Sequence, residues 1–189
     1  MEINIELQQS ILKFSDKNIP QNILHGRPHR DRVLKYAKLI NKKKVKASWD
    51  IIYISVLCHD IGHRFGRENH HIKSADLTQI FMNKLGIDIR IIENVKHCIL
   101  THSRQFSACK PETEEAKVLY DADGMDLFGA IGIQRAILSC GIADTGLDCL
   151  IKKLKWRLQV ASDFYSKTAM KYVKNNMKII KAFINSLEQ

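Results

Sequence analysis

Apolar positions recur with a helical period along almost the whole chain. Leu7, Ile11 and Phe14 are three or four residues apart, and a similar stripe follows Pro28. This spacing places apolar side chains on one face of a helix, and proline is favoured in the first turn of a helix. The same period predicts further helices over residues 70–85, 88–101, 113–121, 124–138, 146–165 and 167–187. An all-α fold follows.

One strongly apolar segment leaves its secondary structure open. The run from Ile51 to Cys58 is broken only by Ser55, and a short buried run of this kind fits a helix or a strand. The chain contains no Pro/Gly-rich linker, and its connections near residues 62–69 and 103–112 are polar. We therefore expect one domain, with an N-terminal helix and lead-in over 1–24, a core over 25–140 and C-terminal helices over 141–189 packed on that core.

Composition is that of a globular protein without a membrane span. Of the 189 residues, 45% are hydrophobic and 26% are charged, and both values are ordinary. No apolar stretch approaches the roughly 20 residues that cross a bilayer, and the N-terminus lacks the pattern of a signal peptide. The five cysteines are odd in number and form no CxxC pair, which favours a reducing compartment. We expect a cytoplasmic protein with no membrane partner.

The net charge of +10 is concentrated towards the C-terminal end. Lys171, Lys174, Lys178 and Lys181 recur at helical spacing, which is typical of an amphipathic helix with a solvated basic face. Nucleic-acid binding also needs groups that stack on or read bases, and the pattern shows none, so nucleic acid is not an expected partner. A basic surface does attract anionic small molecules. An apolar helix face packs either internally or on a second copy, which leaves a homodimer open.

The dipeptide His59-Asp60 closes the apolar run and is the strongest chemical signal. An imidazole and a carboxylate are costly to bury without partners, and both are good ligands for divalent metals. Three other such residues fall on apolar helical stripes, namely His29, His102 and Asp123. Each of them taken alone also fits a core residue satisfied by a hydrogen bond. Several helices that aim such groups inward predict a metal site.

Further polar residues extend this set. His71 stands at the start of a predicted helix, and Asp121 and Asp126 share one largely apolar helix with Asp123. Several carboxylates on such a helix favour cation coordination, although Asp126 could instead cap a helix or orient a ligand. His63 lies four residues after His59, so a continued helix would bring it close enough to relay a proton. A polar loop residue is the alternative for His63.

These residues together resemble a known family. The order His29-x-x-Arg32-Val33, then His59-Asp60, then Asp123 is similar to the ligand order of the HD-domain metal-dependent phosphohydrolase superfamily. Residues 120–133 and the lysine-rich stretch 151–154 resemble small stand-alone bacterial HD proteins, some of which are nucleotide pyrophosphohydrolases. The resemblance runs from about residue 25 to the C-terminus. It implies a single-domain HD-type helical bundle with a metal site at its centre, and a helix over residues 49–60.

The resemblance also implies the ligands. A first divalent transition metal (Mn, Fe, Ni, Co or Zn) would be held by His29, His59, Asp60 and Asp123. His71 and His102 match the additional ligand positions of two-metal HD proteins, so one or two metals per chain are expected. The alternative is that these two histidines contact substrate or support the ligands.

The implied function is metal-dependent hydrolysis of a nucleotide or another phosphate ester. A divalent ion polarises a phosphoryl oxygen and activates water, with Asp60 and His63 as the catalytic side chains. Phosphate contacts are expected from three loop residues, Arg64, Arg67 and Arg104, although each also fits plain surface charge. Gly124 follows Asp123 where the family commonly has arginine, so one positive group is missing. A di-iron HD oxygenase and a non-catalytic regulatory protein that binds metal and nucleotide are the alternatives.

Overall fold

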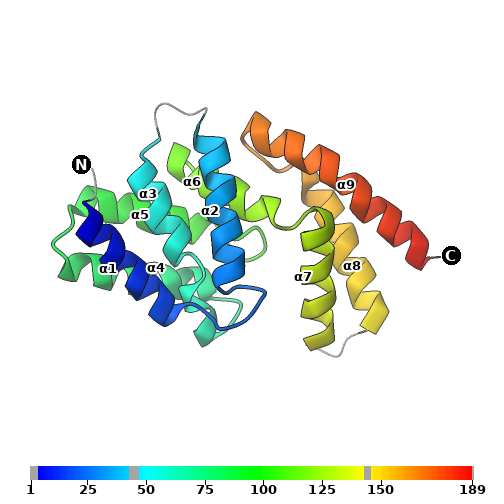
Figure 1. The fold of residues 1–189 in the computed structure, drawn as a ribbon, viewed down its shortest axis with the longest axis horizontal. Coiled ribbons are helices and arrows are strands. Elements are labelled where there is room, and N and C mark those ends of the chain that lie inside the picture. Colours follow the sequence, from blue (N-terminus) through cyan, green and yellow to red (C-terminus); the bar gives the residue numbers. More distant parts are fainter. Residues whose placement is uncertain (1–3, 43–46, 143–145, 189) are drawn as a thin grey trace.

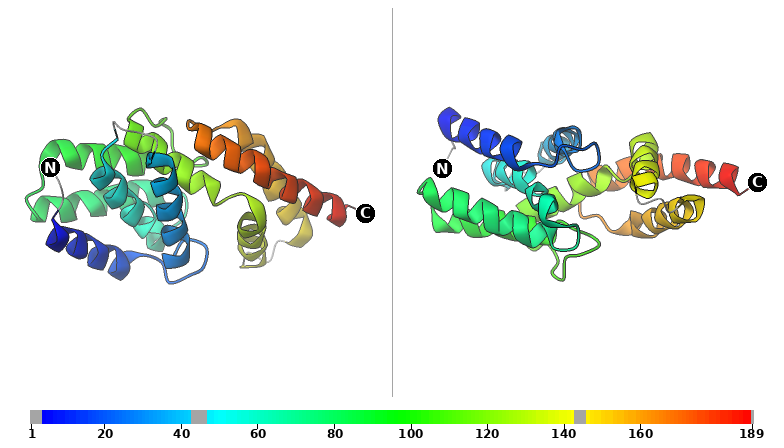
Figure 2. Two further views of the ribbon diagram at one scale, coloured as in Figure 1. Left: turned by 45° about the horizontal axis from the view of Figure 1, so that its top comes forward. Right: turned by 90° about the horizontal axis from the view of Figure 1, so that it is seen from below.

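The computed structural model describes residues 4–42, 47–142 and 146–188, and within these ranges it contains helices and no strand. The all-α prediction is confirmed. Figure 1 shows two lobes, one formed by α1 to α6 and the other by α7 to α9, and Figure 2 shows the same division in two further views. The helices are α1 (Ile5–Asn18), α2 (Arg27–Asn41), α3 (Trp49–Cys58), α4 (His70–Lys84), α5 (Ile89–Thr101), α6 (Glu114–Met125), α7 (Gly129–Ile142), α8 (Gly146–Gln159) and α9 (Lys167–Leu187).

Many helices begin where the sequence supplies a cap. The side chains of Asn4, Asp88, Thr113 and Ser166 each accept a backbone N–H from the first turn of the helix that follows. These bonds satisfy donors that a helix leaves without a partner at its start. Pro28 lies in the first turn of α2, as predicted.

The ambiguous apolar segment is a helix. Ile52, Ile54 and Val56 of α3 are all fully buried, because α1, α2, α5 and α6 all pack around it. A helix surrounded in this way needs no polar face, so its sequence carries no helical period. After α3 the chain makes a short 3-10 helix (Ile61–Phe65), which packs closely on α4. A side chain at Gly62 would collide with the backbone there, since a Cβ would lie 2.2 Å from the His70 carbonyl oxygen.

Three predicted helix boundaries, at two breaks in the chain, were wrong. The helix predicted over 113–121 continues to Met125, and the next begins at Gly129 instead of 124. Gly129 has φ +72°, a conformation that glycine adopts without steric cost. The helix predicted over 146–165 ends at Gln159 and is followed by a 3-10 turn. The apolar period runs on through both breaks because Phe128 and Phe164 are buried although they lie outside helices.

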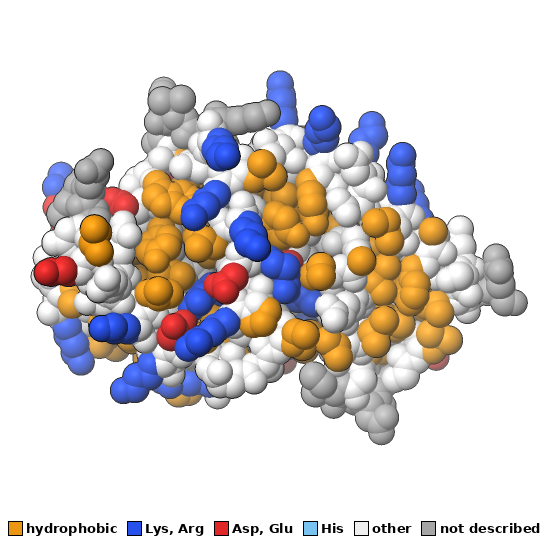
Figure 3. Space-filling model, viewed as in Figure 1, with side chains coloured by type: hydrophobic (Ala, Val, Ile, Leu, Met, Phe, Trp, Pro, Cys, Tyr) orange, Lys and Arg blue, Asp and Glu red, His pale blue; other side chains and the backbone are white. Residues whose placement is uncertain are grey.

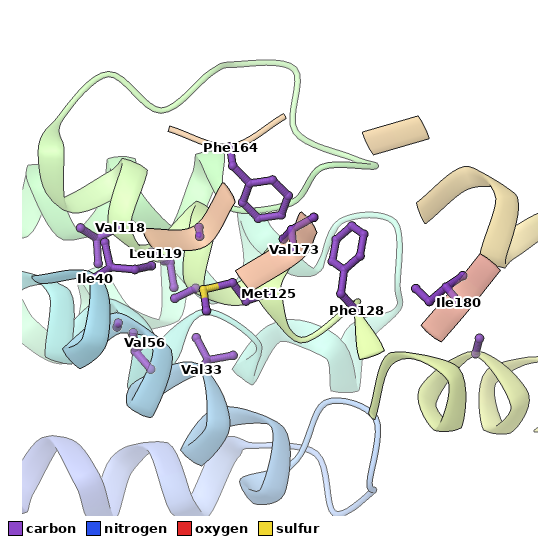
Figure 4. Packing of buried hydrophobic residues seen from close by; sticks show 14 of the residues in the cluster. Val33, Ile40, Val56, Val118, Leu119, Met125, Phe128, Phe164, Val173 and Ile180 are labelled. Atoms are coloured by element: carbon purple, nitrogen blue, oxygen red, sulfur yellow. The ribbon is translucent and has the colours of Figure 1, made fainter. Parts of the chain in front are cut away.

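The larger hydrophobic cluster joins the two lobes. It includes Val33, Val56 and Met125 on one side and Val173 and Ile180 of α9 on the other. In Figure 4, Phe128 lies between Val173 and Ile180. A second cluster lies among α1, α3, α4 and α5. The C-terminal helices therefore pack on the same core that surrounds α3 and α6.

The basic face predicted for the C-terminal helix is exposed to solvent. Lys171, Lys174, Lys178 and Lys181 are all exposed, whereas Val173 is buried. Figure 3 shows basic side chains that project along the edge formed by α9. Within the described ranges, no helix has both the length and the apolar character needed to cross a bilayer.

Candidate metal centre

Histidines and aspartates from several helices meet beside the C-terminal end of α3. His29 comes from α2, His59 and Asp60 directly follow α3, and Asp123 lies in the last turn of α6. The His29 Nε2 atom is 3.2 Å from His59 Nε2, 3.2 Å from Asp123 Oδ1 and 3.5 Å from Asp60 Oδ2. His29, His59 and Asp123 offer ligand atoms that all lie within 4.8 Å of one another. The structure thus brings together the four residues predicted for the first metal.

The hydrogen bonds of the imidazoles leave their Nε2 lone pairs free. His29 Nδ1 donates to Asp126 Oδ2 at 2.7 Å, and His59 Nδ1 donates to the Val56 carbonyl oxygen at 2.8 Å. When both rings are neutral and carry their proton on Nδ1, their two Nε2 lone pairs face each other across 3.2 Å. Lone pairs this close repel unless a positive charge lies between them. The residues therefore fit a metal ion, which accepts neutral imidazole nitrogen and is oriented by such Nδ1 bonds.

The protonation states of His59 and Asp60 agree with metal binding, whereas burial acts to lower the pKa of His29 but its hydrogen bonds to Asp123 and Asp126 raise it. Burial lowers the pKa of His59 to about 4, so this imidazole is neutral at physiological pH. Burial acts to raise the pKa of the Asp60 carboxyl. The neighbouring histidines His59, His63 and His25 outweigh burial and hold this pKa well below its usual range. Neutral imidazoles and ionised carboxylates are the forms that bind metal.

A second histidine group surrounds the other oxygen of Asp60. Its Oδ1 atom lies 3.3 Å from His63 Nε2, 3.7 Å from His70 Nε2 and 3.6 Å from His102 Nε2. His70 and His102 repeat the pattern of the first pair, because each Nδ1 donates at 2.6 Å to a backbone carbonyl and their Nε2 atoms are 3.2 Å apart. The two oxygens of Asp60 thus face two different sets of imidazole nitrogens.

His70, and not His71, takes the position expected beside His102. The ring of His71 lies 5.5 Å from that of His70, and its buried Nδ1 has no hydrogen-bond partner among the described residues. Both residues lie on buried stripes of α4, since Ser74 and Ala75 one turn later are also buried. Adjacent helical residues point about 100° apart. The sequence pattern could not decide which of the two faces Asp60.

His25 belongs to the cluster and has no signal in the sequence. It lies before α2, and its Nδ1 atom is 2.9 Å from Asp60 Oδ2. Its ring stacks on His63 at 3.8 Å, and His63 stacks on His70 at 4.0 Å. Burial lowers the pKa of His25 to about 4. Because the segment before α2 is irregular and polar, no periodic pattern points this side chain inward.

The three aspartates of α6 and its C-terminal cap, Asp121, Asp123 and Asp126, have three different roles. Asp123 faces the Nε2 side of the histidines, 3.2 Å from His29 Nε2. Asp121 accepts the backbone N–H groups of Tyr165 and Ser166 at 2.9 and 2.7 Å, which fixes the start of α9. Cation coordination therefore does not account for Asp121, because this carboxylate points to the C-terminal lobe.

Asp126 holds His29 in place from behind. Its carboxylate receives two bonds from Arg32 at 2.6 and 2.8 Å and one from Arg135 Nη1 at 2.8 Å, besides the bond from His29. Burial acts to raise its pKa, but these partners lower it to about 2. Asp126 is therefore ionised and keeps the Nδ1 proton on His29, which turns the Nε2 lone pair of that ring towards Asp123.

Asp126→Asn should weaken metal binding without removing a ligand. Asparagine keeps the shape but loses the charge that orients His29, and loss of such a supporting partner costs roughly 10–100-fold in metal affinity. Competition with a chromogenic chelator measures the affinity, with Asp31→Asn on the exposed face of α2 as the control. Equal affinities of the Asp126→Asn variant and the wild type would contradict this role.

The cluster opens into a cleft of about 830 Å³ between the two lobes. From the first lobe, His25, Asp60, His63, His70, His102 and Asp123 line it, together with Arg67 and Arg104. From α7 and α8, the lining includes Arg135, Lys152, Lys153, Trp156 and Arg157. Basic residues outnumber acidic ones in this lining, which suits an anionic ligand.

The three arginines predicted to contact phosphate have different positions. Arg64 is exposed beside Phe65 and does not line the cleft. Arg67 lines it and donates to Gln105 Oε1 at 2.9 Å. Arg104 lines it too, but its guanidinium is held between the rings of Tyr120 and Phe164, 3.7 and 4.5 Å from their centroids.

Arg104 fills the space beside Gly124. A Cβ at position 124 would lie 2.3 Å from the Arg104 guanidinium, so any residue other than glycine would displace this guanidinium. Arg104 Nη1 also donates to the Tyr120 carbonyl oxygen at 2.6 Å. The sequence lacks a basic residue directly after Asp123, but the guanidinium of Arg104, from the loop after α5, lies beside this position.

Comparison with known proteins agrees with this geometry. A family model described as the HD domain matches residues 28–127, more than half of the chain. The chain belongs to the HD domain family. HD domains bind divalent metals, and the residues that this HD protein gathers between α2 and α6 could hold one. A search of curated proteins finds no match to this HD protein.

Solved structures show the same fold. A Lactobacillus plantarum protein is 19% identical with a TM-score of 0.82, and the alignment covers 99% of this chain and 97% of the other. Bacillus subtilis YpgQ in complex with ADP is 22% identical with a TM-score of 0.76, covering 96% of each chain. A predicted HD superfamily hydrolase from an uncultured Thermotogales bacterium is 21% identical, with a TM-score of 0.65 and coverage of 97% and 90%. At these identities the likeness concerns the fold.

Proposed function

We propose that this HD protein is a metal-dependent phosphohydrolase that acts on a nucleotide or another phosphate ester. The observation that carries the proposal is the convergence of imidazole lone pairs and two carboxylates at one end of a basic cleft. A divalent ion bound there would polarise a phosphoryl oxygen and lower the pKa of a bound water. The remaining requirements, which are orientation, charge and proton transfer, fall to the side chains of the chain itself.

The first metal would be held by His29, His59, Asp60 and Asp123. A mixed set of nitrogen and carboxylate oxygen suits Mn, Fe, Ni, Co or Zn better than Mg, which prefers oxygen alone. The bonds from Nδ1 to Asp126 and to the Val56 carbonyl oxygen hold the two imidazoles in register before any metal binds. Such preorganisation raises the affinity of a site.

A second metal would be held by His70, His102 and the Oδ1 atom of Asp60. This assignment rests on the division of the Asp60 oxygens between two histidine groups and on the second pair of facing Nε2 atoms. Asp60 would then bridge two ions. His63 lines the cleft beside Asp60 Oδ1, where it could carry a proton to or from the substrate.

A nucleotide is the substrate that we favour. The cleft has the volume of a typical small-molecule site, and Arg67, Lys152 and Lys153 line it in positions to contact phosphate. YpgQ of the same fold was crystallised with ADP, and residues 120–133 resemble small stand-alone bacterial HD proteins, some of which are nucleotide pyrophosphohydrolases. We place the reaction in the cytoplasm, because the five cysteines, all within the described residues, form no disulfide and Cys109 is exposed.

The experiment that tests this proposal combines metal analysis with product detection. Protein purified without chelator is analysed for bound metals and then assayed for phosphate and pyrophosphate release from nucleoside mono- and triphosphates and from p-nitrophenyl phosphate. We expect one or two transition metals per chain, and release that stops with a chelator and returns with Mn²⁺. Two irons with oxygen consumption and no phosphate would indicate an oxygenase. Bound metal and nucleotide without any product would indicate a regulatory protein.

A further inference from the structure

A buried arginine on α8 lacks an acidic partner. Arg157 lines the cleft, yet its residue surface is only 4% exposed. Its Nη1 atom donates to the Gly132 carbonyl oxygen, and its Nε atom is buried without a hydrogen-bond partner. No carboxylate of the described residues forms an ion pair with it. Burying a guanidinium without a counter-charge is unfavourable, and burial lowers its pKa to about 9.

Among the neighbouring charges, Arg135 increases this imbalance and the carboxylate of Asp126 offsets only part of it, since the pKa of Arg157 remains lowered. Arg135 is also buried, and it shares its only ion-pair partner among the described residues, Asp126, with Arg32. Lys153 lies one turn before Arg157, lines the same cleft and donates to Ser139. On the side of the cleft formed by α7 and α8, the acidic lining residue is Asp148. It lies nine residues before Arg157 on α8, about 13 Å along the helix axis. The wall formed by α7 and α8 therefore carries an excess of buried positive charge.

We infer that Arg157, together with Arg135 and Lys153, forms an anion-binding subsite that receives a second anionic group of the substrate. The inference rests on the proposed function and deepens it. The histidine cluster lines the cleft from the first lobe and would hold one phosphoryl group, whereas Arg157 lines it from the second lobe. A substrate that satisfies both walls carries at least two linked anionic groups. For the nucleotide substrate proposed above, the class is thus a nucleoside di- or triphosphate, and not a compound with a single phosphate group.

A purely structural role for Arg157 makes opposite predictions. If its bond to the Gly132 carbonyl oxygen served mainly to join α7 to α8, loss of the guanidinium would lower the melting temperature and impair all substrates alike. If its partner is a ligand anion, the buried charge destabilises the ligand-free protein. An apolar substitute then leaves the melting temperature equal or higher. The two roles can therefore be separated by combining stability with binding.

The test compares Arg157→Met with Lys155→Met, a control on the exposed side of the same helix that pairs with Glu188. With the Mn²⁺-loaded full chain, we expect Arg157→Met to raise KM for a nucleoside triphosphate by roughly tenfold or more, with less than about a twofold change for p-nitrophenyl phosphate. The melting temperature should not fall, and Arg157→Lys should recover part of the loss. Equal effects on both substrates, or a lower melting temperature with unchanged KM values, would overturn the inference.

A binding measurement keeps the subsite separate from catalysis. Inorganic tripolyphosphate is titrated calorimetrically into the full chain after chelation, so that the metal makes no contribution. Arg157→Met should weaken this binding by about tenfold relative to the wild type and to Lys155→Met. If the wild type releases no phosphate from any substrate but this difference is seen, the proposed function fails and the subsite stands. Equal affinities of the three proteins would contradict the inferred subsite.

Discussion

Asp60→Ala is expected to lose both the bound metal and the release of phosphate. Asp60 Oδ2 lies 3.5 Å from His29 and His59, and Oδ1 lies 3.6 Å from His102, so one substitution removes a carboxylate ligand from both histidine groups. Loss of a supporting residue alone costs roughly 10–100-fold, and loss of a shared ligand should exceed this, on the order of 1,000-fold in activity. Elemental analysis and phosphate release measure the two effects.

The control for this variant is Asp76→Ala, which removes a carboxylate from the exposed face of α4. It should retain wild-type metal content and activity, because surface substitutions of this kind rarely disturb a distant site. Circular dichroism confirms that both variants are folded. Unchanged metal content in Asp60→Ala would contradict the assignment of the whole centre.

His70→Ala should reduce the metal content from two ions to one, whereas His71→Ala should not. Only His70 directs Nε2 towards Asp60 and His102, with its Nδ1 proton held by the Arg67 carbonyl oxygen. The two histidines are adjacent on α4 and both are buried, so each variant loses the same atoms from the same helix. The pair is therefore a matched comparison, and titration of the metal-free proteins with Mn²⁺ gives the number of ions that each protein binds.

The comparison has a clear contrary result. If His71→Ala loses the second ion and His70→Ala keeps it, His71 and not His70 is the ligand from the first turn of α4. If both variants and the wild type bind a single ion, the facing Nε2 atoms of His70 and His102 serve a substrate contact instead of a second metal. In that case His70→Ala should raise KM without changing the metal content.

The ordering of apolar and polar positions was sufficient for the fold class and for the first group of candidate ligands. A helical period depends on which residues are buried, and burial is dictated locally by side-chain chemistry. His29 and His102 lie on apolar stripes, so their inward orientation could be predicted before their partners were known. Likewise, His59 and Asp60 end a run too apolar to lie at the surface.

Residues outside regular helices were beyond such prediction. His25 precedes α2 in an irregular segment, yet its Nδ1 atom comes within 2.9 Å of Asp60. The break after Asp126 was misplaced because Phe128 continues the apolar pattern while the backbone turns at Gly129. A pattern of burial records which side chains are inside and does not record the path of the backbone between them.

By itself, then, the sequence determined that this is an all-α chain whose buried histidines and aspartates come from separate helices. The tertiary structure alone decided which imidazole nitrogens lie close together, which of His70 and His71 faces Asp60, and which basic residues are buried. Arg157 shows the reason. In the sequence it is one of many cations on an amphipathic helix, and its burial depends on α7 packing against α8. The electrostatic cost of a charge is set by what surrounds it, and that is supplied by residues distant in the chain.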